Sequence, residues 1–175
     1  ETIDENPTAL GALAITDPER YRAPNMLSCT KNFNILLTDG YPRHDEEPFT
    51  LVDDLPEWVE TVGHASCTKI DGNAAPGTEQ TDDDGECLED IAEYMAKRDL
   101  APSLTGVQKV ATHTIGFNIN LPILEETADV SGGEYFLAED IESLSLALIQ
   151  IFTNVNEEAL SFAAPAVAVN SFNRT

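Results

Sequence analysis

The chain has 175 residues, 42% of them hydrophobic, which is enough for one domain with a real core. It carries 32 acidic and 9 basic residues, a net charge of −23, so nucleic acids and anionic membrane surfaces are disfavoured as partners because like charges repel. No apolar run approaches the roughly 18 residues of a membrane span, so we expect no membrane insertion.

The first predicted elements are a short helix and a strand. Residues 1–6 are acidic and polar, unlike a signal peptide, so we expect a mature or excised fragment. Residues 7–22 are predicted as a short helix with a proline near each end. Residues 32–38 are predicted as a strand, and the apolar run from Ile35 to Leu37 is typical of a strand that helices cover on both faces.

Residues 40–85 form a long polar insertion rich in proline, glycine and aspartate, and a loop of that length is usually functional. Residues 55–62 are its one predicted helix. Trp58 and Tyr41 are its candidate partner-binding residues, because exposed aromatic side chains anchor interfaces. The alternative for Trp58 is that it packs its own short helix against the domain.

The chain has three cysteines, and two of them enclose a polar stretch that no core could organise. A disulfide between Cys67 and Cys87 would hold that stretch together, which favours an oxidising compartment. Cys29 then has a partner outside the chain or stays free. The alternative is a zinc site formed by Cys29, His64, Cys67 and Cys87, although no Cys-x-x-Cys pair supports it.

From residue 86 onward, helix and strand patterns alternate regularly. The predicted elements are a helix at 87–100, a strand at 109–117, a helix at 121–130, a strand at 133–138 and a helix at 140–155. This alternation predicts an α/β, Rossmann-like fold, a parallel sheet flanked by helices and joined by right-handed crossovers. Residues 159–175 are predicted as an extended segment after the domain.

Asp39 follows the first strand directly, and Gly40 comes next. Ligands of open parallel sheets lie beyond the carboxyl ends of the strands. A carboxylate at that place suits a hard cation such as Mg²⁺ or Ca²⁺, which prefers oxygen ligands. Gly40 is expected to let the backbone turn sharply there. The alternative is that Asp39 caps the following turn.

The segment "NILLTDG" resembles the fourth core strand of a von Willebrand factor A-type domain, and "ATHTIGF" with "GGEYFLAEDIESLSLALIQI" is similar to its last two strands and final helix. Three longer segments, "CTKNFNILLTDGYP", "GECLEDIAEYMAKRDL" and "LSFAAPAVAVNSFNRT", together resemble the type IV pilus tip-associated adhesin and biogenesis proteins of the PilY family. The resemblance covers most of residues 7–175. It implies that residues 1–158 are the C-terminal part of such a domain and that residues 159–175 lead toward a further, C-terminal domain.

The resemblance also implies a metal site, in part. Asp39 matches the aspartate of the metal-ion-dependent adhesion site, and Thr8 in "PTALGAL" is similar to its threonine. The alternative for Thr8 is a helix N-cap, which needs the same hydroxyl. An Asp-x-Ser-x-Ser motif, which supplies most ligands of such a site, is missing from this sequence. The site is therefore incomplete in this chain, and Mg²⁺ or Ca²⁺ would bind weakly.

Other candidate sites are less specific. Four acidic residues precede a predicted helix and favour its start through the helix dipole: Asp82, Asp83, Asp84 and Glu86. They lack the alternating spacing of a calcium loop. His44, His64 and His113 have no serine or cysteine neighbour at catalytic spacing. The sequence also has no P-loop, no G-x-S-x-G and no G-x-G-x-x-G, so we expect no enzyme.

The resemblance therefore implies a non-enzymatic adhesion or assembly module of a type IV pilus tip-associated protein, exported through the periplasm to the cell surface. Its expected partners are pilus components or a host or surface ligand, bound at the metal face. An exposed edge of the strand at 32–38 would favour a dimer or a strand-swapped oligomer. The alternatives are an A-type binding module of an unrelated surface protein and a metal-dependent hydrolase that uses Asp39.

Overall fold

The computed structural model describes residues 31–42, 52, 55–68, 70–74 and 87–161. Within these residues the elements are β1 (Asn32–Thr38), α2 (Trp58–Val62), α3 (Leu88–Lys97), β2 (Val110–Phe117), α4 (Pro122–Ser131), β3 (Tyr135–Ala138) and α5 (Ile141–Ser161). Each lies where the sequence predicts an element of its type. The extended segment predicted at 159–175 is wrong at its first residues, because α5 continues as a helix to Ser161. The rest of that segment and the helix predicted at 7–22 lie outside the described residues.

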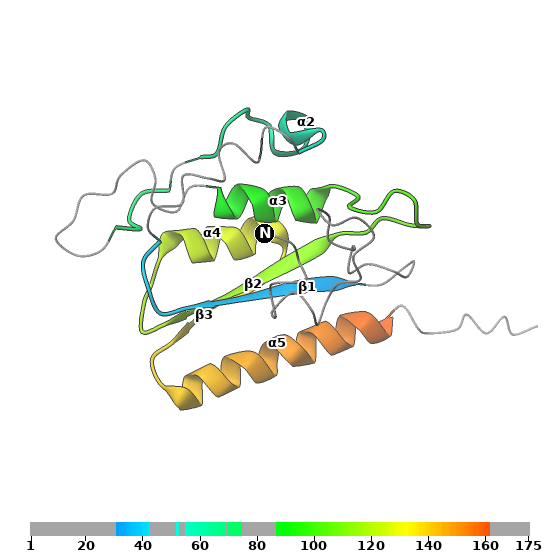
Figure 1. The fold of residues 1–175 in the computed structure, drawn as a ribbon. Helices are drawn as coiled ribbons and strands as arrows, with labels where there is room; N and C mark the ends of the chain where they lie inside the picture. The colour runs from blue at the N-terminus through cyan, green and yellow to red at the C-terminus, as the bar shows by residue number, and fades with distance from the viewer. Residues whose placement is uncertain (1–30, 43–51, 53–54, 69, 75–86, 162–175) are drawn as a thin grey trace, which may run out of the picture.

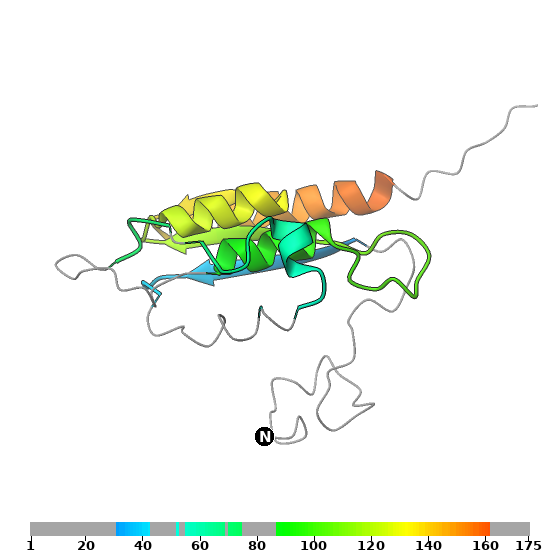
Figure 2. The ribbon, with the colours of Figure 1, turned by 90° about the horizontal axis from the view of Figure 1, so that it is seen from above.

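The three strands form one parallel sheet in the order β1-β2-β3. Helices α3 and α4 cover one face of the sheet, and α5 lies on the other (Figure 1). The view from above shows that α5 lies toward the β3 side of the sheet, away from β1 (Figure 2). This arrangement confirms the predicted α/β, Rossmann-like fold class.

The layer between the sheet and α4 is built from aliphatic side chains. Its buried members are Ile119, Leu121, Ile123 and Leu124. Helix α4 begins with Pro122, which has no N–H to leave unpaired there, and ends at Gly132, whose φ of 75° is a left-handed cap. The Thr114 hydroxyl of β2 donates a hydrogen bond to the Leu124 carbonyl over 2.6 Å, so the helix and the central strand are joined inside the core.

The layer between the sheet and α5 is smaller. Its buried members are Ile115, Ala138, Ala147 and Ile151. Asp140 and Ser143 cap α5, because Asp140 Oδ1 accepts a hydrogen bond from the Ser143 N–H over 2.8 Å. These bonds favour the charged carboxylate and lower the pKa of Asp140.

The outer side of β1 differs from the expectation that helices cover both of its faces. Ile35 is 36% exposed and Leu37 is 49% exposed. Leu36 points to the other face and packs against the core beside α3 and α4. Because α5 contacts β2 and β3 but lies away from β1, the described residues cover only one face of that strand.

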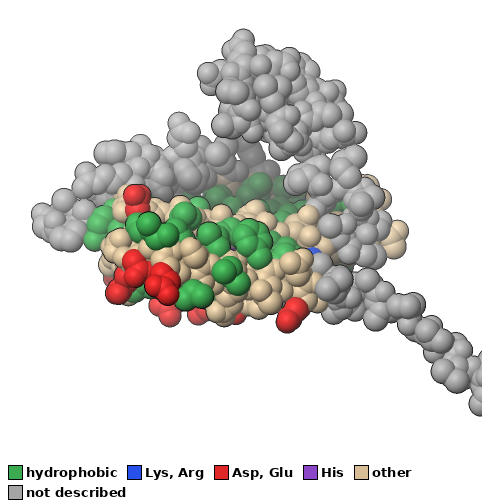
Figure 3. Space-filling view, turned by 90° about the horizontal axis from the view of Figure 1, so that it is seen from below, with side chains coloured by type: hydrophobic (Ala, Val, Ile, Leu, Met, Phe, Trp, Pro, Cys, Tyr) green, Lys and Arg blue, Asp and Glu red, His purple; other side chains and the backbone are tan. Residues whose placement is uncertain are grey.

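The exposed face of the sheet continues onto α5. Leu146, Ile149 and Phe152 of this helix are more than half exposed. Figure 3 shows that side, where hydrophobic side chains run along the molecule and acidic ones gather toward one end. A continuous apolar surface of this kind is typical of a contact surface.

The insertion packs onto the outer side of α3. The Trp58 ring lies 5.5 Å from the Tyr94 ring, and the Tyr94 hydroxyl donates a hydrogen bond to the Pro56 carbonyl over 2.8 Å. Farther along, Asn73 Oδ1 accepts a hydrogen bond from the Ile123 N–H in the first turn of α4. The described parts of the insertion are thus fastened to both helices of this layer.

Candidate metal centres

Asp39 lies at the carboxyl end of β1, as predicted. Thr38 pairs with Gly116 of β2, and the next residue of β2, Phe117, pairs with Ala138 of β3. The three strands therefore end at nearly the same level, and Asp39 is exposed at that edge of the sheet. This is the edge at which ligands bind in open α/β sheets.

The turn after β1 is closed by Thr38. Its hydroxyl oxygen accepts a hydrogen bond from the Gly40 N–H over 3.2 Å. The backbone bends at Asp39 and Gly40, as expected. Gly40 does not have a positive φ, so the bend does not depend on the conformational freedom of glycine. Among the described residues, the carboxylate of Asp39 makes no hydrogen bond and remains available to a ligand.

The other predicted metal ligand, Thr8, lies outside the described residues, as do Cys29 and His44. Asn118 follows β2 directly, and Asp140 lies two residues after the end of β3, but the Asp140 carboxylate is engaged in the cap of α5. Within the part of the chain that the structure describes, Asp39 does not belong to a group of three potential metal ligands.

A different group of side chains could hold a metal ion. His64, Asp90 and Glu93 each offer a ligand atom, and these atoms lie within 4.8 Å of one another. The His64 Nε2 atom is 3.1 Å from Asp90 Oδ1. Asp90 and Glu93 are three residues apart on α3, so they share one face of that helix.

Thr68 holds the buried carboxylates of Asp90 and of its neighbour Glu89 in place. Its N–H donates a hydrogen bond of 2.6 Å to Asp90 Oδ2, and its hydroxyl lies 2.9 Å from Glu89 Oε1. Glu89 and Asp90 are only 3% and 2% exposed. Both line a pocket of about 280 Å³ together with His64, Glu93 and Glu126.

Burial raises the pKa of Glu89 from 4.5 to about 7, because desolvation disfavours the charged form. The hydrogen bonds to its carboxylate act in the opposite direction, while the negative charges of Asp90 and Glu126 raise the pKa further. A neutral Glu89 is therefore abundant near neutral pH in the absence of a cation.

The predicted disulfide is present, and it lies beside this group. Cys67 and Cys87 are joined, with their Cα atoms 4.7 Å apart. Because both sulfurs are in the disulfide, the alternative zinc site with Cys29 and His64 is wrong: two of its four ligands are not thiolates. A disulfide is compatible with an extracellular location.

The other predicted residues have structural surroundings. Trp58 is 4% exposed in the core beside Tyr94, so its ring is not on the surface. Tyr41 is half-buried against the apolar cluster under α4. His113 is buried in β2, where its Nδ1 accepts a hydrogen bond from the Glu134 N–H over 3.1 Å and its ring stacks on Phe33.

Sequence reasoning missed the group around His64. It considered that histidine only as a base or as a cysteine-zinc ligand. The available signal was "EDIAE" at residues 89–93, which places Glu89, Asp90 and Glu93 within one helical turn. What brings His64 to them is the fold of the insertion, for which the sequence offered only the disulfide as a clue.

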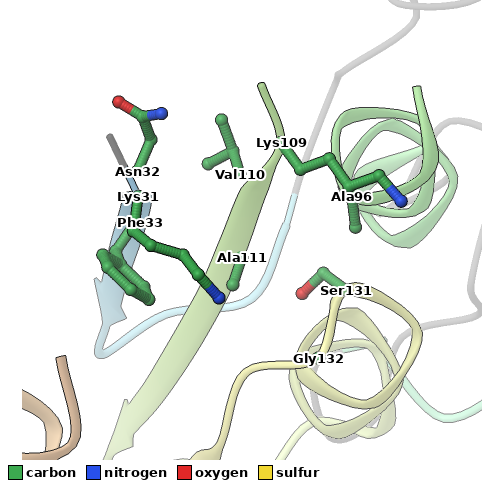
Figure 4. A pocket seen from close by; sticks show the side chains of 9 residues that line it. All are labelled: Lys31, Asn32, Phe33, Ala96, Lys109, Val110, Ala111, Ser131 and Gly132. Atoms are coloured by element: carbon green, nitrogen blue, oxygen red, sulfur yellow. The ribbon is translucent and has the colours of Figure 1, made fainter. Parts of the chain in front are cut away.

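A second pocket, at the amino ends of β1 and β2, has a different character (Figure 4). It is lined by two lysines, small side chains and the end of α4. In Figure 4 the side chain of Lys31 ends beside Ala111 and that of Lys109 ends beside Ala96, so the two ammonium groups do not converge on one point in the pocket. This pocket has no acid–base pair among its lining residues.

No helix in the described ranges combines the length and hydrophobicity needed to cross a membrane. Comparisons with protein-family models, with curated proteins and with solved structures found no match to this chain.

Proposed function

We propose that the chain is a non-enzymatic binding module that holds its ligand through a divalent cation at the carboxyl edge of the sheet. The observation that carries this proposal is the position of Asp39: it is exposed at that edge, directly after β1, and Thr38 rather than Asp39 closes the turn. A carboxylate that the described fold does not use is free to bind a cation.

The ion would be Mg²⁺ or Ca²⁺, because both prefer oxygen ligands. Asp39 supplies one ligand, and the resemblance to A-type domains assigns a second to Thr8. An acidic group of the bound partner would complete the coordination. With so few ligands from this chain, the cation binds weakly until the partner arrives.

The resemblance to PilY proteins extends the proposal to biology. The module belongs to an exported type IV pilus tip-associated protein and contacts pilus components or a host or surface ligand. The disulfide supports a compartment outside the reducing cytoplasm. The exposed apolar face of β1 and α5 supports a protein partner or a second copy of the chain.

Two alternatives use the same edge. A binding module of an unrelated surface protein would share the metal chemistry but not the pilus partner. A metal-dependent hydrolase would use Asp39 as a ligand or nucleophile. Against the hydrolase, the described residues place no histidine or cysteine at Asp39, since His64 and His113 both lie elsewhere in the fold.

Replacing Asp39 with Ala tests the proposal. We expect purified type IV pili to retain the wild-type chain in Mg²⁺ but not in EDTA, and the Asp39→Ala variant to be retained in neither. Asp129→Ala, which removes an exposed carboxylate from α4, is the matched control and should behave as the wild type. Equal retention of the Asp39→Ala variant would contradict the metal mechanism. Retention of no variant, together with hydrolysis of a phosphate ester that depends on Asp39, would favour the hydrolase.

A further inference from the structure

We propose that His64, Asp90 and Glu93 form a binding site for a first-row transition-metal dication such as Zn²⁺, which fastens the loop at residues 63–68 to α3. This site shares no residue with the carboxyl edge at Asp39. It stands or falls independently of the proposed function.

The ligand atoms have nearly the spacing that such an ion needs. Around a tetrahedral Zn²⁺ with bonds of about 2.0–2.2 Å, ligand atoms lie about 3.3–3.5 Å apart. The His64 Nε2 and Asp90 Oδ1 atoms are 3.1 Å apart, and the whole group fits within 4.8 Å. The pair is therefore spaced for an ion. Glu93 supplies the third ligand atom, and its carboxylate, which is ion-paired with Lys97 Nζ, would exchange that partner for the ion.

The hydrogen bond on the far side of the imidazole points to the same use. His64 Nδ1 lies 2.6 Å from the carbonyl oxygen of Ser66. A carbonyl only accepts, so Nδ1 carries the proton and Nε2 directs its lone pair toward Asp90. Metal-binding histidines are oriented in this way by a carbonyl or carboxylate on the other nitrogen.

Asp90 is prepared in the same way. The Thr68 N–H binds its Oδ2 atom and leaves Oδ1 facing His64. Because the proton of His64 is on Nδ1, its Nε2 atom and Asp90 Oδ1 face each other over 3.1 Å with a lone pair each. These lone pairs repel unless a second proton or a cation lies between them. The experiment must therefore distinguish a second proton on the imidazole from a metal ion bound between the two atoms.

Glu89 is an independent sign of a ligand. This side chain is 3% exposed and lines the pocket, and its Oε2 atom has no hydrogen-bond partner. A buried carboxylate oxygen without a partner is costly. A dication in the same pocket would supply an electrostatic partner for this oxygen.

The ligand set selects the class of metal. An imidazole nitrogen suits Zn²⁺ and its first-row neighbours, whereas Mg²⁺ and Ca²⁺ prefer oxygen alone. Three protein ligands leave one position open for water or for a group of a partner. The site therefore differs in selectivity from the oxygen site at Asp39.

The disulfide positions the two halves of the site. Cys67 lies between Ser66, which binds His64, and Thr68, which binds Asp90. Its partner Cys87 immediately precedes α3. Breaking it would release the loop that carries His64 from the helix that carries the carboxylates. Zn²⁺ affinity should accordingly fall on reduction, which makes the site dependent on an oxidising compartment.

The test is calorimetric titration of the metal-free chain with Zn²⁺, with variants His64→Gln and Glu93→Gln. Glu60→Gln on α2 is the matched control, because it removes an exposed carboxylate of the same insertion layer. We expect one tightest site in the wild type and in the control, weakened at least about tenfold in both site variants. The Asp39→Ala variant should keep the Zn²⁺ site, and Mg²⁺ in excess should not displace the ion.

Nitrogen-15 NMR of the histidine rings in the wild type guards against misfolded variants. Zn²⁺ should shift the Nε2 resonance of one histidine whose Nδ1 keeps its proton. Unchanged Zn²⁺ affinity in His64→Gln, displacement of Zn²⁺ by excess Mg²⁺, or no ring-nitrogen shift would each overturn the proposal and leave an ordinary ion pair between His64 and Asp90.

Discussion

Three consecutive residues at the end of β1 have three different structural roles. The Thr38 hydroxyl closes the turn, Asp39 is left exposed, and Gly40 has a backbone that other residues can adopt. A Cβ atom on Gly40 would meet nothing within 4 Å. The sequence pattern placed Asp39 correctly at the end of β1, and the metal role of its carboxylate stays a prediction. The pattern did not foresee the part of Thr38, whose hydroxyl lies one position earlier and bonds to the same turn.

Glu89 carries the clearest pH-dependent prediction at the residue scale. Its pKa is raised to about 7 in the folded chain, against 4.5 ordinarily. The folded state therefore holds a proton that the unfolded state has lost between these values. The contribution of Glu89 to stability is fully present below about pH 4.5 and is lost as pH rises through about 7. Glu89→Gln should flatten this loss and stabilise the metal-free chain at pH 8 by roughly 1–3 kcal/mol.

Urea denaturation in EDTA at pH 5 and pH 8 measures the effect. Glu60→Gln is again the control and should keep the wild-type difference between the two pH values. If Glu89→Gln shows the same difference as the wild type, the buried carboxylate is not the group that titrates.

At the scale of elements, sequence periodicity was sufficient to predict a helix or strand whose bounds depend on local signals alone. The apolar spacing of α3, the proline that opens α4 and the glycine that ends it are local signals, and α3, β2 and α4 were predicted close to their bounds. What periodicity could not supply is the offset of α5 toward β3. That offset depends on which strand the last helix packs against, and the same apolar stripe would suit either.

Gly133 tests how tightly α4 and the sheet approach each other. A Cβ atom at this position would lie 2.0 Å from the Thr112 carbonyl oxygen, which is backbone and cannot move aside as a side chain does. Gly133→Ala should destabilise the chain by about 1–3 kcal/mol through overpacking. Gly40→Ala, with open space around it, should change stability by less than about 0.5 kcal/mol.

Chemical denaturation of both variants beside the wild type is the measurement. A Gly133→Ala variant as stable as Gly40→Ala would mean that the segment between α4 and β3 lies farther from β2 than the structure shows.

At the scale of the whole molecule, two properties oppose each other. The net charge of −23 keeps copies of the chain apart in solution. The outer face of β1 and the neighbouring flank of α5 expose large apolar side chains, which favour contact. Charge repulsion between copies is screened by salt, whereas apolar burial is not. Association through this face should therefore grow with ionic strength.

We expect light scattering to find a dimer of the wild-type chain at micromolar concentration in high salt, and more monomer in low salt. Leu37→Lys places a charge on the exposed face of β1, near its carboxyl end, and should leave a monomer under both conditions. Val59→Lys is the matched control, because Val59 on α2 is 49% exposed, as Leu37 is, but lies on the opposite side of the molecule. A wild-type chain that stays monomeric in high salt would show that this face does not bind a second copy, whereas a dimer that Val59→Lys abolishes would place the interface on the insertion instead.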